Sequence, residues 1–83
     1  MTPQEARELI ERALAQVAPE SDLSALPPDA DFRDALELDS LDFLSFVEAL
    51  SDASGYRIEE DDYRELTSVA GGAEFLAART GPG

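Results

Sequence analysis

The sequence contains no cysteine and no histidine, and these two absences limit its chemistry. Without cysteine the chain can form neither a disulfide nor a thiolate metal site. Without histidine it cannot build a Ser-His-Asp or Cys-His arrangement, and zinc would have carboxylates as its only ligands. We therefore predict a chain that is not catalytic by itself and that folds by packing alone.

Long hydrophobic runs are also missing. No apolar stretch approaches the roughly 18 residues of a membrane-spanning helix, and no charged start is followed by an apolar run and a cleavage site. We therefore expect a cytoplasmic protein with no membrane partner. With 83 residues, of which 43% are hydrophobic, the chain 1–83 is expected to form one small domain with a frayed tail at 80–83.

Basic residues are scarce, because six Lys and Arg stand against 19 Asp and Glu, which gives a formal net charge of −13. That potential repels nucleic acid and anionic membranes and attracts basic protein surfaces. Nucleic-acid binding is thereby excluded, whereas solubility and attraction of a protein partner explain the acidity equally well. The helical spacing of the apolar residues argues against disorder.

The carboxylate clusters raise the question of calcium. An EF-hand loop that began at Asp29 would need glycine at its sixth position and glutamate at its twelfth, but Asp34 and Ser40 stand there. A loop that began at Asp52 fails in the same way. No dedicated metal site is predicted.

Signals for helix starts and ends predict a first helix followed by a long loop. The segment Thr2–Glu5 is typical of a helix N-terminus, and apolar residues at helical spacing extend this helix to about Ala18. The stretch 19–39 follows as a loop with a short helical turn near Phe32–Leu36. Apolar side chains should hold this loop against the core, namely Leu23, Leu26, Phe32, Leu36 and Leu38.

Three further helices complete the expected fold. Apolar spacing predicts a second helix over about 40–53, and Gly55 should end it because glycine adopts a left-handed cap without steric cost. Ile58 should anchor a turn before a short helix at 59–66, and a last helix should run over about 68–79. The predicted fold class is therefore all-α, a small four-helix bundle of three longer helices and one short one.

The predicted second helix has two different faces. At about 100° per residue, one stripe gathers large apolar side chains toward the core, namely Phe43, Phe46, Val47 and Leu50. The opposite side carries Leu41, Ser45, Glu48 and Asp52, with Leu44 between the two faces. An exposed leucine with a rim of carboxylates is typical of a docking surface, although single exposed leucines are also ordinary.

Ser40 stands at the start of this helix, between Asp39 and Leu41. It has no base among its sequence neighbours, so its hydroxyl is a poor nucleophile at neutral pH. Unpaired backbone N–H groups at a helix start favour an anion such as a phosphate ester, but Glu37, Asp39 and Asp42 oppose one. From these residues alone, capping of the helix by Ser40 or Asp39 is the better interpretation.

Essentially the whole chain resembles the acyl carrier protein family. The match rests on the segment 36–44, LELDSLDFL, followed at suitable spacing by Val47, Ala49, Leu50, Ile58 and 67–69. The triplet Asp-Ser-Leu supports this match because it stands at the start of the second helix of an acidic four-helix chain.

The resemblance implies that Ser40 receives a 4′-phosphopantetheine arm from coenzyme A, added by a magnesium-dependent phosphopantetheinyl transferase. The arm would carry acyl groups as thioesters, and basic patches on acyl-transferring, condensing or ligase enzymes would read the second helix. The implied recognition residues are Asp39, Leu41, Asp42, Leu44 and Glu48. The implied lining of a space for the acyl chain is Phe46, Val47, Leu50, Ile58, Leu66 and Val69.

Two positions depart from the pattern common in fatty-acid carriers, since Glu37 stands where glycine is frequent and Ser45 where an acidic residue is usual. These departures leave room for a polyketide or other specialised pathway. Peptidyl carriers more often have glycines before the serine, so an acyl cargo is favoured over an aminoacyl one. We expect a free-standing monomeric carrier; the alternative is an unmodified acidic adaptor that binds a basic protein through the same helix face.

Overall fold

The computed structural model describes residues 1–80, and within this range the protein is all-α. Three longer helices carry the fold, namely α1 (Pro3–Val17), α3 (Ser40–Ser54) and α4 (Val69–Thr80). Shorter pieces lie in the connections, namely the 3₁₀ turn η1 (Leu23–Ala25), the single-turn helix α2 (Phe32–Ala35) and the 3₁₀ helix η2 (Glu60–Glu65). The predicted bundle of three longer helices with shorter elements is confirmed.

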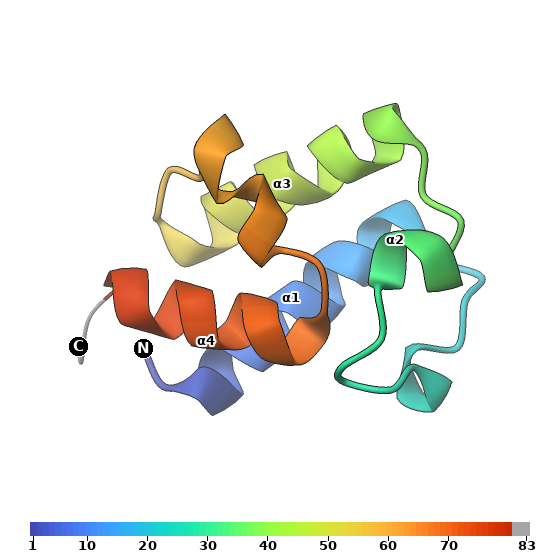
Figure 1. Ribbon diagram of the computed structural model, residues 1–83, viewed down its shortest axis with the longest axis horizontal. Coiled ribbons are helices and arrows are strands. Elements are labelled where there is room, and N and C mark those ends of the chain that lie inside the picture. Colours follow the sequence, from blue (N-terminus) through green and yellow to red (C-terminus); the bar gives the residue numbers. More distant parts are fainter. Residues whose placement is uncertain (81–83) are drawn as a thin grey trace.

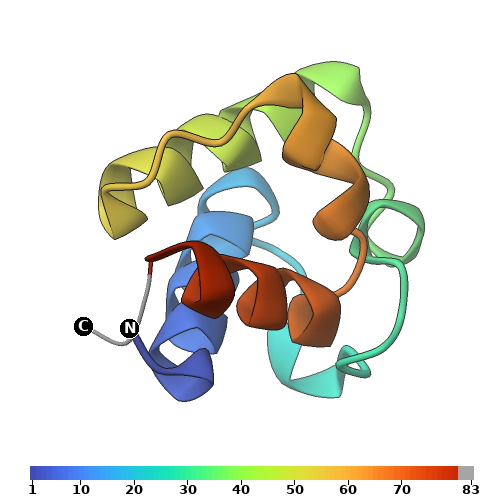
Figure 2. The ribbon, with the colours of Figure 1, turned by 60° about the vertical axis from the view of Figure 1, so that its left-hand side comes forward.

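Helix α1 is the centre of the packing, because it contacts both α3 and α4. Figures 1 and 2 show α3 on one side of α1 and α4 on another. The buried side chains of α1 recur at helical spacing as Ala6, Ile10, Ala13 and Leu14. Ile10 and Leu14 are completely buried, and burial of each such side chain contributes about 1.5–3 kcal/mol. This apolar stripe therefore joins the two other long helices.

The start of α1 has the capping box that the sequence predicts. The Thr2 hydroxyl accepts the Glu5 N–H at 3.1 Å, and the Glu5 carboxylate accepts the Thr2 N–H at 2.9 Å. The hydrogen bonds from Thr2 hold the pKa of the Glu5 carboxyl below its ordinary value. The helix ends with Ala18 as its C-cap, directly before Pro19, because a residue that precedes proline disfavours helical dihedrals.

The long loop between α1 and α3 is pinned to the start of α4. The Phe32 N–H donates to the Thr67 carbonyl at 3.0 Å, and the Ala70 N–H donates to the Pro28 carbonyl at 2.8 Å. The Phe32 ring is fully buried and meets the Phe46 ring edge-on at a centroid distance of 5.2 Å. The loop is therefore part of the packed structure, as its apolar residues predict.

Helix α4 begins at a cap and lies close against α1. The Ser68 hydroxyl accepts the Gly71 N–H at 3.0 Å. A side chain at Gly72 would place its Cβ 3.0 Å from the Ile10 Cδ1, so glycine at this position permits the close approach of the two helices. The α4 side chains Val69, Ala73, Phe75 and Leu76 are all buried.

One of the expected elements has a different form in the structure. The short helix predicted at 59–66 is a 3₁₀ helix over Glu60–Glu65, a form that is frequent in short connectors. The predicted frayed tail at 80–83 begins at Thr80, which is the last residue of α4 and donates its hydroxyl to the Leu76 carbonyl at 2.8 Å. Residues 81–83 lie outside the described residues. Over residues 1–80, no helix is long and apolar enough to cross a membrane.

Candidate functional site

The turn that ends α2 determines where Ser40 lies. The Leu38 N–H donates to the Arg33 carbonyl at 2.8 Å, and the Glu37 N–H donates to the Asp34 carbonyl at 3.2 Å. These two bonds form a Schellman motif, in which Glu37 occupies the left-handed position with φ of +54°. The motif ends α2 and leads the chain directly into the start of α3.

Glu37 is the one non-glycine residue with a positive φ in the described part of the chain. A left-handed conformation costs a residue with a Cβ about 1–2 kcal/mol, whereas glycine adopts it freely. The Schellman geometry therefore gives a physical reason why glycine suits this position.

Substitutions at Glu37 should separate this backbone strain from the effect of charge. Glu37→Val should lower the free energy of unfolding by about 1 kcal/mol or more, because a β-branched residue tolerates a positive φ poorly. Glu37→Asn, which also removes the charge, should leave stability unchanged or raise it, since asparagine accepts this conformation. Urea unfolding followed by circular dichroism measures both variants, and equal stabilities for Val and Asn would contradict the assigned geometry.

Asp39, and not Ser40, caps α3. The Asp39 carboxylate accepts the Asp42 N–H at 2.8 Å, and the Asp42 carboxylate reaches back toward the Asp39 N–H at 3.5 Å. The Ser40 side chain is exposed, and its hydroxyl makes no hydrogen bond to any residue within 1–80. The sequence left open whether Ser40 or Asp39 caps this helix. The structure assigns the cap to Asp39.

The surroundings of the Ser40 hydroxyl combine the positive end of a helix with negative side chains. The backbone N–H groups of Ser40 and Leu41 have no acceptor among residues 1–80 and lie at the positive end of the α3 dipole. Asp39 and Asp42 repel a free anion from the same place. An ester phosphate tethered to Ser40 would remain in spite of that repulsion and would face the two amides.

A basic side chain also lies close to the first turn of α3. The Arg33 guanidinium, from α2, stands over the Phe43 ring at 4.4 Å from its centroid. Phe43 follows Ser40 by three residues, a spacing that makes the two side chains neighbours on a helix surface. Arg33 therefore offsets part of the negative charge around the candidate site.

The different roles of Asp39 and Ser40 can be tested by measuring the free energy of unfolding of their variants. Asp39→Ala should lower the free energy of unfolding by about 1 kcal/mol, the usual cost of losing an N-cap side chain. Ser40→Ala should change it by less than about 0.5 kcal/mol, because the hydroxyl supports no contact in the fold. Chemical denaturation of the two variants beside the wild type measures both values. A loss in Ser40→Ala as large as that in Asp39→Ala would show that Ser40 is the structural cap.

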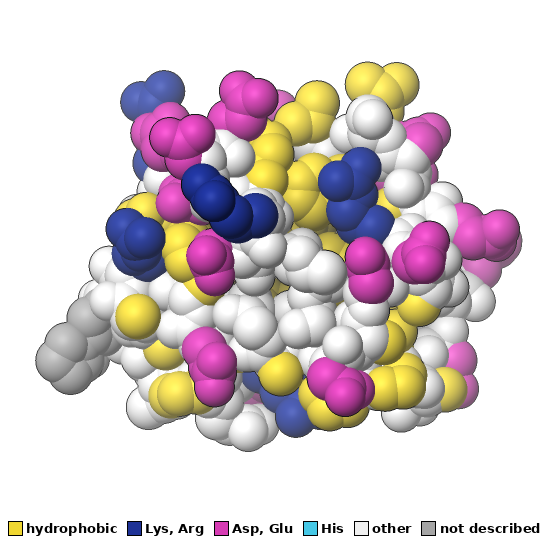
Figure 3. Space-filling view, in the orientation of Figure 1, with side chains coloured by type: hydrophobic (Ala, Val, Ile, Leu, Met, Phe, Trp, Pro, Cys, Tyr) yellow, Lys and Arg dark blue, Asp and Glu magenta, His cyan; other side chains and the backbone are white. Residues whose placement is uncertain are grey.

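Helix α3 has the two faces that its sequence predicts. Phe43, Phe46, Val47 and Leu50 are buried, whereas Ser45, Glu48 and Asp52 are exposed. Leu41 is 74% exposed and Leu44 is 43% exposed, and these are the large hydrophobic side chains on the surface of the described chain. Figure 3 shows hydrophobic side chains standing out over α3, with carboxylates beside them. This face has the composition of a docking surface.

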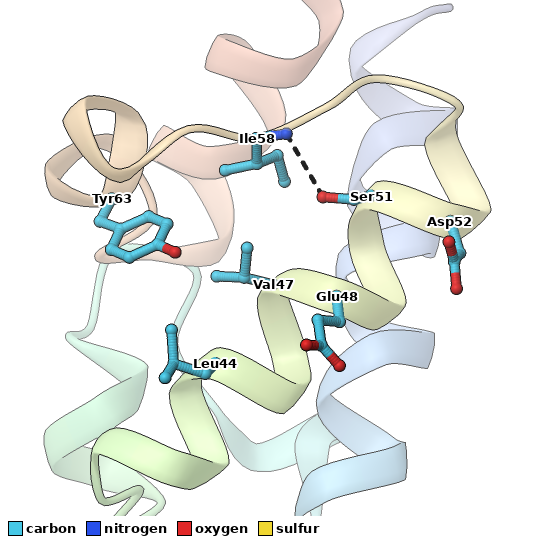
Figure 4. Close-up of a pocket in the computed structure, with 7 residues that line it drawn as sticks. All are labelled: Leu44, Val47, Glu48, Ser51, Asp52, Ile58 and Tyr63. Atoms are coloured by element: carbon cyan, nitrogen blue, oxygen red, sulfur yellow. Dashed lines mark hydrogen bonds between the residues drawn. The ribbon is translucent and has the colours of Figure 1, made fainter.

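A groove of about 380 Å³ runs between α3 and the segment that contains η2. Its α3 wall is formed by Leu44, Val47, Glu48, Ser51 and Asp52, and Ile58 and Tyr63 form the opposite wall (Figure 4). Leu44, Val47 and Ser51 follow Ser40 by four, seven and eleven residues, which places all of them on one helix face. The groove therefore begins about one helical turn beyond Ser40 and continues along the same side of α3.

The residues expected to line an acyl space divide into two groups. Val47 and Ile58 line the groove. The other four lie in the core at 0–3% exposure and do not line it, namely Phe46, Leu50, Leu66 and Val69. The sequence interpretation missed Ser51 and Tyr63. The helical spacing of Ser51 from Leu44 could have revealed it, whereas Tyr63 depends on how η2 folds against α3.

Comparison with known proteins supplies independent findings. A family model described as the phosphopantetheine attachment site matches residues 5–76 of this chain. An acyl carrier protein of Rubrobacter xylanophilus is 33% identical over 55 residues, which are 66% of this chain and 68% of that protein. An acyl carrier protein of Lactobacillus johnsonii is 33% identical over 66% of this chain and 69% of that protein. One of Acidothermus cellulolyticus is 32% identical over 69% of this chain and 68% of that protein.

Proposed function

Because the chain belongs to the family of phosphopantetheine-binding carrier proteins, we propose that Ser40 is the residue that carries its 4′-phosphopantetheine arm. Proteins of this family are non-catalytic carriers that phosphopantetheinyl transferases modify and that serve partner enzymes. One observation supports Ser40 in particular. Asp39 caps α3. The Ser40 hydroxyl is therefore exposed at the positive end of the helix, where it makes no hydrogen bond within 1–80.

The chemistry of attachment follows from what this chain lacks. The Ser40 hydroxyl has no histidine or cysteine to activate it, so the base that removes its proton must belong to the transferase. The Ser40 Oγ attacks the phosphorus of coenzyme A that bears the pantetheine, the diphosphate P–O bond breaks, and adenosine 3′,5′-bisphosphate leaves. The product is a phosphodiester at the Ser40 Oγ. The backbone N–H groups of Ser40 and Leu41, which have no acceptor within 1–80, are placed to offset the charge of that group.

The exposed face of α3 is proposed as the surface that partner enzymes recognise. Leu41 and Leu44 supply the apolar contact, and Glu48 supplies negative charge beside them. Asp39 and Asp42 are held in place by their mutual capping, so their charges have a fixed position next to Ser40. The complementary partner surface is basic with an apolar pocket, as on a transferase or an acyl-transferring, condensing or ligase enzyme.

The cargo is proposed to be an acyl group carried as a thioester, in a fatty-acid, polyketide or related pathway. The position of the groove supports this assignment, because it begins at Leu44 on the same helix face as Ser40 and has apolar walls at Val47 and Ile58. An arm attached at Ser40 can therefore lie along α3 and place its cargo there.

Attachment at Ser40 has a direct test. Incubation with coenzyme A, magnesium and a broad-specificity phosphopantetheinyl transferase should raise the mass of the intact protein by one phosphopantetheine, and Ser40→Ala should abolish the gain. Ser24→Ala, which removes an exposed hydroxyl in η1, outside the proposed docking face, is the matched control and should be modified normally. Absence of a mass gain with several transferases would favour an unmodified acidic adaptor instead, and a gain retained by Ser40→Ala would place the arm on another residue.

The docking face has its own test in the rate of that modification. Leu41→Ala should lower kcat/KM of the transferase about tenfold, the effect of losing about 1.4 kcal/mol of contact. Glu48→Lys should slow the reaction most at low salt, where surface charges are least screened. Glu8→Lys makes the same charge change at an exposed position of α1 and serves as the control. Equal rates for the Glu48 and Glu8 variants, with all of them folded, would exclude this face.

A further inference from the structure

Arg33 is held beside the first turn of α3 by contacts of both its backbone and its side chain. Its N–H donates to the Asp31 carboxylate at 3.0 Å, and its carbonyl accepts the Leu38 N–H at 2.8 Å. Its guanidinium lies over the Phe43 ring, 4.4 Å from the centroid. Because Phe43 and Ser40 are neighbours on the helix surface, these contacts give the basic group a defined position beside Ser40.

The donors of the Arg33 guanidinium are unused within the described chain. The side chain is exposed and makes no ion pair and no hydrogen bond with any residue of 1–80. Contact with a ring face occupies none of the five N–H donors of an arginine, and their planar fork fits the oxygen atoms of a phosphate. Arg33 therefore offers a full positive charge and several free donors beside α3.

The charges around Ser40 indicate what this basic group is suited to bind. Glu37, Asp39 and Asp42 stand close to Ser40 in the chain, and the Asp39–Asp42 capping box fixes two of these carboxylates at the helix start. A phosphodiester at Ser40 adds a further negative charge to this group. The helix terminus supplies only about half a positive charge, whereas a guanidinium supplies a full one. Arg33 is therefore the side chain suited to neutralise a phosphodiester at Ser40.

We propose that Arg33 binds the phosphodiester that joins the arm to Ser40, and that it thereby directs the start of the arm toward the Phe43 side of α3. This inference rests on the proposed attachment of the arm at Ser40. It gives α2, the single-turn helix that precedes the attachment site, a part in holding the prosthetic group.

The arginine Nε–Hε resonances, recorded by NMR before and after modification, test this contact in the unaltered chain. An exposed ion pair favours the conformers that contain it by about two- to fivefold, so the Arg33 resonance should move when the arm is attached. The movement should shrink when the salt concentration is raised from about 0.02 M to about 0.5 M, because salt screens exposed charges. The Arg79 resonance should stay in place, since the last turn of α4 and the first turn of α3 lie at opposite ends of the molecule (Figures 1 and 2).

Phosphorus NMR of modified variants identifies the group that Arg33 contacts. Arg33→Gln should shift the resonance of the phosphodiester. Arg79→Gln makes the same charge change and also removes an arginine from a ring face, that of Phe75, and it should leave the phosphorus resonance in place. Amide spectra of the two unmodified variants should match that of the wild type away from the substituted residue, which shows that both are folded.

Two results would overturn this inference alone. One is an Arg33 resonance that does not move when the arm is attached. The other is a phosphorus resonance that Arg33→Gln changes no more than Arg79→Gln does, because any contact of Arg33 would then be with the amides of the arm instead of its phosphate. An arm found on a residue other than Ser40, or no arm at all, would overturn the proposed function as well.

Discussion

The hydrogen bond from the Asp42 N–H to the Asp39 carboxylate is the interaction on which the candidate site depends. An α-helix begins with N–H groups that need acceptors, and serine is as good a cap as aspartate. If Ser40 served as the cap, its hydroxyl would be committed to the backbone and the helix would begin one residue later. Because Asp39 is the N-cap, Ser40 is the first residue of the helix, and its hydroxyl makes no hydrogen bond within residues 1–80. The Schellman turn at Glu37 supports this register by fixing the path of the chain before Asp39.

The aromatic residues of α3 are central to the packing of the core. Phe46 packs against both Phe43 and Phe32 of the long loop, and all three rings are buried in the core. This packing stabilises a small domain that has no disulfide to assist it. It also fills the interior of the bundle with buried side chains. None of these three rings lines the groove beside α3.

Much of the fold could be predicted because local signals and tertiary packing agree. The capping box at Thr2 and Glu5, the left-handed cap at Gly55 and the buried stripe of α3 are each encoded within a few residues.

The groove could not be predicted in the same way. Helical spacing identifies which residues of α3 face inward, but it does not reveal what lies opposite them. Tyr63 reaches the groove from η2, a 3₁₀ helix that follows α3 in the chain and lies opposite it across the groove. The left-handed conformation of Glu37 could not be predicted either, because glycine is the residue that normally indicates such a position.

The proposed recognition face and the core use different side chains over most of α3. Leu41 and Glu48 are exposed and take no part in the core, so a partner can bind them without any rearrangement of the fold. Asp39 and Asp42 are the exception. Their carboxylates cap the helix and also carry the charge nearest to Ser40, so a basic partner side chain that paired with either would compete with the helix N-terminus for the same oxygen atoms. Of the two, Asp42 makes the longer hydrogen bond, and its carboxylate is therefore the one that a partner can engage at the smaller cost to the helix.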